Sequence, residues 1–143
     1  MTAFVSSVDI DRPAAEVFAY ATDPVHFPEW QKDVVRVDVE SREVGSRFVT
    51  VRKIAGAERG MTQEITENEP PRTWAARGVG GPIRPTATIT VEALGDSRCR
   101  ATFSLDFDGR GVAAPLAPVV RRMAAKVAPA SYQRLKERLE ATN

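Results

Sequence analysis

Few side chains in this sequence could perform nucleophilic or metal chemistry. It contains one histidine, His26, and one cysteine, Cys99. A single cysteine forms no internal disulfide, and the pair cannot supply a multi-histidine or cysteine-rich metal site. Any serine or cysteine nucleophile would have to use His26 as its base. The residue types therefore argue against a hydrolase triad, and we expect no metal and no cofactor.

His26 itself lies next to Phe27 and near Trp30. It could act as a general base or a hydrogen-bond donor at the mouth of a cavity. No carboxylate stands at a spacing that must orient the imidazole. We interpret His26 as a partly exposed loop residue, and the catalytic role is the less favoured alternative.

One glycine motif has the spacing of a phosphate-binding loop. Gly109, Gly111 and Ala114 match the pattern G-x-G-x-x-A between a predicted strand and a predicted helix. A dinucleotide-binding unit needs a second parallel strand after that helix, and here the sequence finishes in the helix. We therefore expect a strand-to-helix hinge at this motif.

Two polar side chains share their strand parity with apolar neighbours. Gln63 alternates with Ile65, and Arg52 alternates with Phe48. A buried amide or guanidinium without a partner costs a few kcal/mol, so water, a ligand or a neighbour must satisfy it. Two interpretations remain open at this point: a tightly packed interior in which Gln63 bonds to Trp74 or to the backbone, or a cavity.

The composition is that of one ordinary globular domain spanning residues 1–143. The chain is 43% hydrophobic and 27% charged, with a net charge of +1. Because no global positive field is present, we do not expect nucleic-acid binding. The first residues show neither a basic leader nor a long apolar run, which predicts a cytoplasmic location.

Hydrophobic alternation along the chain indicates the secondary-structure elements that position these side chains. It predicts seven strands, at Phe4–Ile10, Val34–Ser41, Ser46–Ile54, Arg59–Asn68, Thr73–Gly80, Thr86–Leu94 and Arg98–Asp108. The last six are joined by connections too short for crossover helices, so these neighbours must pair antiparallel. Helical spacing predicts a short helix after Pro13, a second irregular one from Pro24 to Trp30, and a long one from Ala113 to Ala141, kinked at Pro129. The order is that of an α+β protein whose last helix covers one antiparallel sheet.

The last predicted helix carries a basic face. It consists of Arg121, Arg122, Lys126, Arg134, Lys136 and Arg138. We interpret this face as solvated surface, because the net charge is near zero, and a membrane-docking face, as a lipid carrier could use, is the less favoured alternative. The alternation also shows no large exposed apolar patch, which argues against a structural or regulatory protein-interaction module.

Several short motifs, in this order, resemble the START-like (SRPBCC) superfamily of polyketide cyclase/dehydrase and lipid-transport proteins. They are Arg12-Pro13-Ala14, Val17-Phe18, Asp23-Pro24, Trp30, Val44 to Phe48, Glu69 to Arg72, Gly81-Pro82 and Leu135 to Glu140. The resemblance spans nearly the whole chain. It implies a helix-grip fold, in which a curved sheet of about seven strands wraps around the C-terminal helix, with two short helices between strands one and two. It also favours an internal cavity.

Small residues lie on both expected walls of that cavity. They are Ala76, Gly78, Gly80 and Ala87 on the strands and Ala117, Ala124, Ala125 and Ala128 on the helix. Small side chains either let two layers close up or leave a void, and we favour the void on the strength of the resemblance. The expected ligand-binding residues are Phe27, Trp30, Phe48, Arg52, Gln63, Trp74, Ile89, Phe103 and Met123, with the loop from Gly78 to Pro85 at the entrance.

The leading hypothesis is a module that binds or carries an apolar or aromatic small molecule, such as a lipid, a quinone or a polyketide-like compound. Gln63 and Arg52 would orient this partner. The alternative is a cyclase/dehydrase-like enzyme acting on a poly-carbonyl or aromatic substrate, with Arg52 stabilising an enolate and His26 at the mouth. No inward-facing Asp or Glu is apparent on any strand, so we rank catalysis second.

Overall fold

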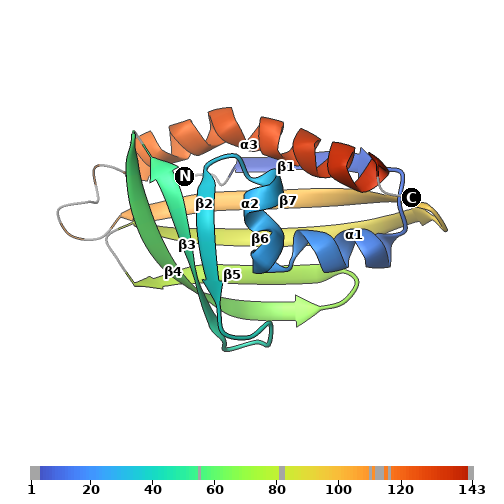
Figure 1. The fold of residues 1–143 in the computed structure, drawn as a ribbon, viewed down its shortest axis with the longest axis horizontal. Coiled ribbons are helices and arrows are strands. Elements are labelled where there is room, and N and C mark those ends of the chain that lie inside the picture. Colours follow the sequence, from blue (N-terminus) through green and yellow to red (C-terminus); the bar gives the residue numbers. More distant parts are fainter. Residues whose placement is uncertain are drawn as a thin grey trace.

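The computed structural model describes residues 4–54, 56–80, 83–109, 111, 115 and 117–141. Figure 1 shows one curved sheet with a long helix lying along its concave side. In chain order the elements are β1 (Phe4–Ile10), α1 (Ala14–Ala21), η1 (Pro24–His26), α2 (Phe27–Trp30), β2 (Val34–Val39), β3 (Arg47–Ile54), β4 (Ala57–Glu69), β5 (Thr73–Gly80), β6 (Ile83–Gly95), β7 (Arg98–Gly109) and α3 (Ala117–Ala141).

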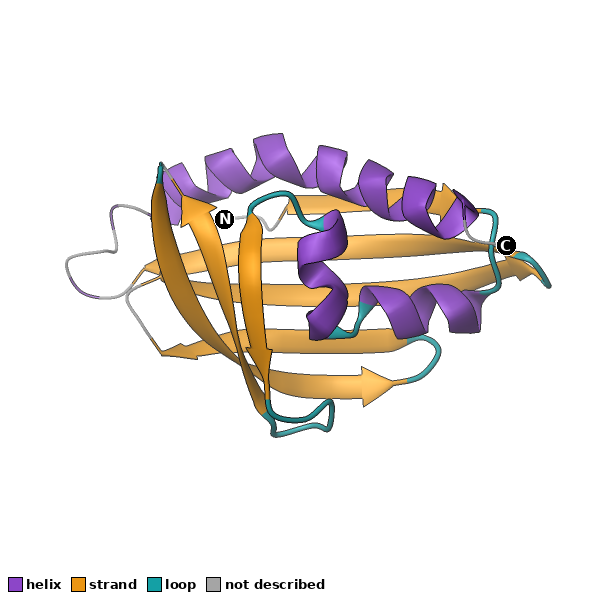
Figure 2. Cartoon of the chain, viewed as in Figure 1, coloured by secondary structure: helices purple, strands orange, loops and turns teal. Residues whose placement is uncertain are grey.

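The seven strands form a single antiparallel sheet in the order β1-β7-β6-β5-β4-β3-β2. Consecutive strands from β2 to β7 are neighbours, and only β1 is placed beside a strand distant in sequence, β7. Figure 2 shows β2, β3 and the start of β4 turning steeply across the direction of β6 and β7, so that the sheet curls around α3. The predicted α+β helix-grip architecture is confirmed.

The strand boundaries follow the predicted alternation closely. Two strands, β1 and β5, have the predicted bounds, whereas β4 and β6 each begin a few residues earlier than expected. The long helix starts at Ala117, and it continues through Pro129 to Ala141. Residues 81 and 82 of the predicted entrance loop lie outside the described residues, as do residues 110 and 112–114 of the glycine motif. The entrance loop and the hinge therefore remain predictions there.

The two short helices are placed by local signals. Pro13 is the residue before α1, and Val17, Phe18 and Ala21 form its buried face. The Asp23 carboxylate accepts a hydrogen bond from the Val25 backbone N–H at 3.2 Å, which starts η1. Together these helices place α2 beside the sheet and α3, where Trp30 contacts Phe103 of β7 and Tyr132 of α3.

Polar contacts anchor α3 at both ends. At its C-terminal end, Arg12 donates from Nε to the Leu139 carbonyl at 2.7 Å, and Lys136 Nζ donates to the Asp9 carbonyl at 2.8 Å. Near its N-terminal end, Arg121 donates to the Asp106 carboxylate and, at 2.7 Å, to the Phe107 carbonyl. The basic face is therefore only partly the solvated surface that we expected. Arg122, Lys126 and Arg134 are exposed, but three other members bind the rest of the fold.

Buried apolar residues form two clusters under α3. The larger one contains Trp30, Trp74 and Leu135, and the smaller one consists of Met61, Phe107 and Val120 near the helix's N-terminal half. Where the two clusters meet, the packing is incomplete, and this is where the candidate site lies. Among the described residues, no helix combines the length and the hydropathy needed to cross a membrane.

Candidate functional site

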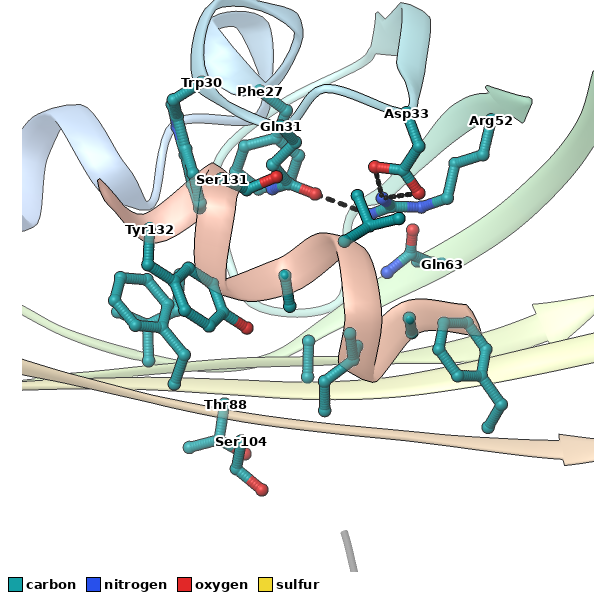
Figure 3. Close-up of a pocket in the computed structure, with 18 of the residues that line it drawn as sticks. Phe27, Trp30, Gln31, Asp33, Arg52, Gln63, Thr88, Ser104, Ser131 and Tyr132 are labelled. Atoms are coloured by element: carbon teal, nitrogen blue, oxygen red, sulfur yellow. Dashed lines mark hydrogen bonds and ion pairs between the residues drawn. The ribbon is translucent and has the colours of Figure 1, made fainter. Parts of the chain in front are cut away.

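An internal cavity of about 60 Å³ lies between the concave face of the sheet, α2 and the middle of α3. Figure 3 shows side chains from both layers around it. By this measure the cavity has room for a few water molecules. An internal space is therefore present where we expected one, but it is small.

Aromatic rings form most of the wall at one end of the cavity. Tyr132 of α3 stacks on Phe103 of β7 with ring centroids 4.1 Å apart and planes 11° apart. Trp30 lies 5.7 Å from Phe103 and 6.3 Å from Tyr132, again between ring centroids. Interlocked rings of this kind hold one another in place, so this end is a preformed flat apolar surface.

Seven of the nine predicted ligand-binding residues line this cavity: Phe27, Trp30, Arg52, Gln63, Trp74, Ile89 and Phe103. Phe48 is not among the lining residues; its ring is buried and packs edge-on against Phe27 with their centroids 6.1 Å apart. Met123 lines a second, smaller cavity of about 40 Å³ under the N-terminal half of α3. Whether any of the nine binds a ligand remains a prediction.

The small residues do not act together as we expected. A Cβ atom on Gly78 would lie 2.8 Å from Arg84 Cα and 2.8 Å from Pro85 Cδ, so this glycine allows β6 to approach β5 closely. On the strands only Ala87 of the four lines the cavity, and on α3 only Ala124 and Ala128 do. Gly78 therefore serves the packing of neighbouring strands within the sheet, and only three of the eight small residues border the cavity.

Arg52 lies inside the fold, at the polar side of the cavity. It is 9% exposed, and its Nη1 donates to both carboxylate oxygens of Asp33 at 3.1 Å each. Nη2 donates to the Gln31 side-chain oxygen at 2.8 Å, and Nε is buried with no partner among the described residues. Figure 3 shows this pair beside the amide of Gln63. The cavity wall therefore contains an ion pair.

Asp33 is a lining residue that the strand parity did not reveal. It belongs to the turn between α2 and β2, where its carbonyl accepts a hydrogen bond from the Lys53 backbone N–H at 2.8 Å. This contact holds the turn against β3, next to Arg52. The prediction of no inward-facing Asp or Glu concerned the strands alone, and the carboxylate that lines the cavity comes from a turn, which strand parity does not cover.

The side chain of Gln63 is almost fully buried, and its oxygen has a hydrogen-bond partner. Thr50 Oγ1 donates to the Gln63 side-chain oxygen at 3.0 Å, a partner that we did not predict. Its amide nitrogen faces the cavity in Figure 3 and has no hydrogen-bond partner among the described residues. Gln63 therefore presents donor N–H groups to the interior.

Tyr132 is the second polar group that the sequence did not single out. Burial raises the pKa of its phenol to about 12, so the hydroxyl is neutral at physiological pH. Figure 3 shows that the hydroxyl points into the cavity. Tyr132 lies three residues before Leu135 and seven before Leu139, both buried, and this helical spacing was the available signal for its inward position.

His26 lies outside the cavity. Its Nδ1 is 3.1 Å from Glu29 Oε2, and its ring stacks on Tyr20 with centroids 4.7 Å apart. Hydrogen bonds from Tyr20 and from His26 lower the pKa of Glu29. The imidazole is therefore oriented by a carboxylate three residues away, contrary to our expectation. Its partial exposure is as expected, and it is not among the described residues that line the cavity, which goes against the less favoured alternative of a catalytic role at the mouth.

Groups for metal or thiol chemistry are not gathered at the site. In the part of the chain that the structure describes, no three His, Cys, Asp or Glu side chains come together as metal ligands. Cys99 is buried in the core, and burial raises the pKa of its thiol to about 11. A thiol with that pKa is almost fully protonated at neutral pH and a poor nucleophile.

A family comparison agrees with this geometry. The family described as "Polyketide cyclase / dehydrase and lipid transport" matches residues 1–141. The chain belongs to this family. The START-like resemblance of the sequence is thereby confirmed. A search of curated proteins finds no match.

Solved structures share the fold at low sequence identity. A START superfamily protein from Mycobacterium smegmatis is 13% identical, with a TM-score of 0.82 and 100% of both chains covered. The Zhui aromatase/cyclase from Streptomyces sp. R1128 is 14% identical, with a TM-score of 0.82 over 96% of this chain and 93% of that one. The di-domain ARO/CYC BexL from the BE-7585A biosynthetic pathway is 17% identical, with a TM-score of 0.75 over 98% of this chain. The present chain spans 47% of BexL's length, and at these identities the likeness shows the fold alone.

Proposed function

We propose that this polyketide cyclase/dehydrase and lipid-transport family member binds an apolar or aromatic small molecule in the cavity between the sheet and α3. The observation that carries the proposal is the combination of an aromatic wall with polar groups that face the same space. Trp30, Phe103 and Tyr132 supply flat apolar contact. The Gln63 amide and the Tyr132 hydroxyl supply hydrogen bonds that fix orientation.

Binding requires the cavity to expand. Drug-sized ligands occupy sites of roughly 300 to 1,000 Å³, far more than the present volume. The larger and the smaller cavity share one wall, made by Asp33, Arg52, Phe107, Ala124 and Val127. Outward movement of the N-terminal half of α3 would join the two spaces. We therefore expect ligand binding to separate this half of α3 from the sheet.

The test compares two variants of the same helix. Ala128 is buried and lines the cavity, whereas Ala130, two residues on, is exposed. Ala128→Leu fills the space and should weaken binding of the neutral dye N-phenylnaphthylamine at least about tenfold. Ala130→Leu should leave binding unchanged. If the folded wild-type protein does not bind the dye, and native mass spectrometry finds no co-purifying small molecule, the proposal is wrong.

A cyclase/dehydrase-like enzyme is the second candidate. The observation in its favour is Arg52, a buried guanidinium on the cavity wall that could stabilise a developing enolate. Among the described residues that line the cavity, its partner Asp33 is the carboxylate that could accept a proton, whereas His26 lies elsewhere. Turnover of a poly-carbonyl substrate that collapses in Arg52→Ala, but not in His26→Ala, would place this function first.

Other features of the proposal rest on the sequence. Residues 1–143 would act as one ligand-binding domain located in the cytoplasm. The expected partner is a hydrophobic small molecule, in agreement with the lipid-transport part of the family's description. Cell fractionation with an antibody to the native protein would test the location.

A further inference from the structure

The charges that face the cavity cancel. Among the described residues that line it, only Arg52 and Asp33 carry a full charge. The two groups are hydrogen-bonded to each other at 3.1 Å, and their side chains are 10% and 25% exposed. Lys53 lines the smaller neighbouring cavity, but it is exposed, and solvent screens its charge. The wall thus offers an incoming molecule an ion pair with no net charge.

An anionic ligand would meet an unfavourable environment here. A carboxylate, sulfonate or phosphate must lose its water shell to enter an apolar cavity, and an uncompensated positive charge would offset that loss most strongly. The Arg52 guanidinium is already compensated by Asp33. The Asp33 carboxylate, which faces the same space, repels a second negative charge at short range.

The remaining polar groups suit an uncharged molecule. The Gln63 amide nitrogen and the Tyr132 hydroxyl are neutral donors directed at the cavity. Neutral donors match carbonyl or hydroxyl oxygens, and they leave no charge to be balanced. The stacked pair of Phe103 and Tyr132 adds a flat surface for a ring.

We propose that the Arg52–Asp33 pair makes this cavity selective for uncharged aromatic ligands and excludes anionic ones such as fatty-acid carboxylates. This inference rests on the proposed ligand-binding function and narrows its ligand class. Asp33 determines the specificity, because it cancels the cation that would otherwise attract an anion.

Two dyes with the same aromatic skeleton provide the test. N-phenylnaphthylamine is neutral, and anilinonaphthalene sulfonate is the same molecule with one sulfonate added. In Asp33→Asn, which leaves the Arg52 charge uncompensated, the affinity for the sulfonate should rise about tenfold or more. The readout is the ratio of the sulfonate affinity to the neutral-dye affinity, which should rise about tenfold or more whatever the change in the affinity for the neutral dye. Asp38→Asn is the matched control, since it removes the same charge from an exposed position on β2 and should change neither affinity.

Two further variants separate charge from other effects. In Arg52→Gln, Asp33 remains as an unpaired negative charge, and sulfonate binding should weaken about tenfold or more relative to the neutral dye. In the double variant Arg52→Gln/Asp33→Asn the pair is again neutral, and the ratio of the two affinities should return to within about threefold of the wild-type ratio. These variants keep the test valid if Asp33→Asn alone fails to fold.

The outcomes distinguish a failure of the charge selectivity from a failure of the proposed ligand-binding function. If the wild-type protein binds neither dye, the proposed function fails. If it binds the neutral dye and the affinity ratio is the same in wild type, Asp33→Asn and Arg52→Gln, the charge selectivity is wrong while the binding function stands. The inference is supported if the ratio of sulfonate affinity to neutral-dye affinity follows the summed charge of residues 33 and 52 in all four proteins. The ratio should be highest in Asp33→Asn and lowest in Arg52→Gln.

Discussion

The phenol ring of Tyr132 on α3 lies parallel to the ring of Phe103 on β7, with 4.1 Å between ring centroids. This contact joins the helix to the sheet at the cavity wall, and it points the Tyr132 hydroxyl inward (Figure 3). One residue therefore contributes to the packing of the two layers and to the polarity of the site.

Removing the Tyr132 hydroxyl should change the response of stability to alkaline pH. Burial raises the pKa of the phenol from 10.0 to about 12 in the folded protein. Between these values the unfolded chain loses the proton and the folded chain keeps it, so the free energy of unfolding falls as pH rises from about 10 to about 12. The loss from this group is at most about 3 kcal/mol.

Urea denaturation of wild type and Tyr132→Phe over this pH range measures the effect. Below pH 10 the two proteins should differ by less than about 1 kcal/mol, because phenylalanine keeps the stack on Phe103. Above pH 10, the free energy of unfolding of the wild type should fall more steeply with pH than that of Tyr132→Phe. The buried Cys99 thiol titrates in the same direction in both proteins and cancels in the comparison. Parallel curves up to pH 12 would contradict the assignment.

Gly78→Ala should destabilise the fold. Its new Cβ would lie 2.8 Å from Arg84 Cα and Pro85 Cδ, and these atoms can move only if β6 shifts. We expect a decrease of about 1 to 3 kcal/mol in the free energy of unfolding, measured by urea denaturation.

Gly60→Ala on β4 is the matched control for this change. The nearest atom to its Cβ would be Val49 Cγ1 at 3.9 Å, an ordinary contact. This variant should be neutral or slightly stabilised, because alanine reduces the freedom of the unfolded chain. Equal effects at Gly78 and Gly60 would show that the close approach of β5 and β6 has no energetic weight.

Arg12→Ala should loosen the C-terminal end of α3. Arg12 donates to the carbonyl of Leu139 at 2.7 Å and to that of Glu140 at 3.4 Å, and both groups lie in the last turn of the helix. The expected loss is about 1 to 2 kcal/mol, with faster amide hydrogen exchange in that turn. Arg134→Ala, at an exposed position of the same helix, should change stability by less than about 0.5 kcal/mol. Unaltered exchange in Arg12→Ala would rule out the anchoring role.

Gln63→Leu should affect ligands that bear a carbonyl group more than those that do not. The amide nitrogen of Gln63 faces the cavity, and leucine keeps most of the volume but offers no donor. We expect the affinity for a naphthoquinone to fall about tenfold and that for N-phenylnaphthylamine to change less than about threefold. Fluorescence titration and competition measure both, with the exposed Gln133→Leu as the control. A uniform decrease for both ligands would indicate general damage to the cavity.

Patterns along the chain were sufficient to predict most of the fold. Alternating apolar residues placed seven strands close to their observed positions, because the two faces of a strand differ in burial with a period of two. Short connections required β2 to β7 to pair antiparallel with their neighbours. Strand parity also predicted that four side chains face the interior, and all four line the cavity: Arg52, Gln63, Trp74 and Phe103.

Tertiary structure alone decided the chemistry of the site. Asp33 belongs to a turn, where no period relates sequence position to direction, and its backbone contact with Lys53 places its carboxylate on Arg52. Parity says which face a side chain lies on but not how far away the opposite layer is. Small residues could therefore predict either a void or close contact between the layers. In the structure Ala87 lines the space, whereas Gly78 allows a close approach between the neighbouring strands β5 and β6. The distance between layers is set by the packing of all side chains together, and it exists only in the folded protein.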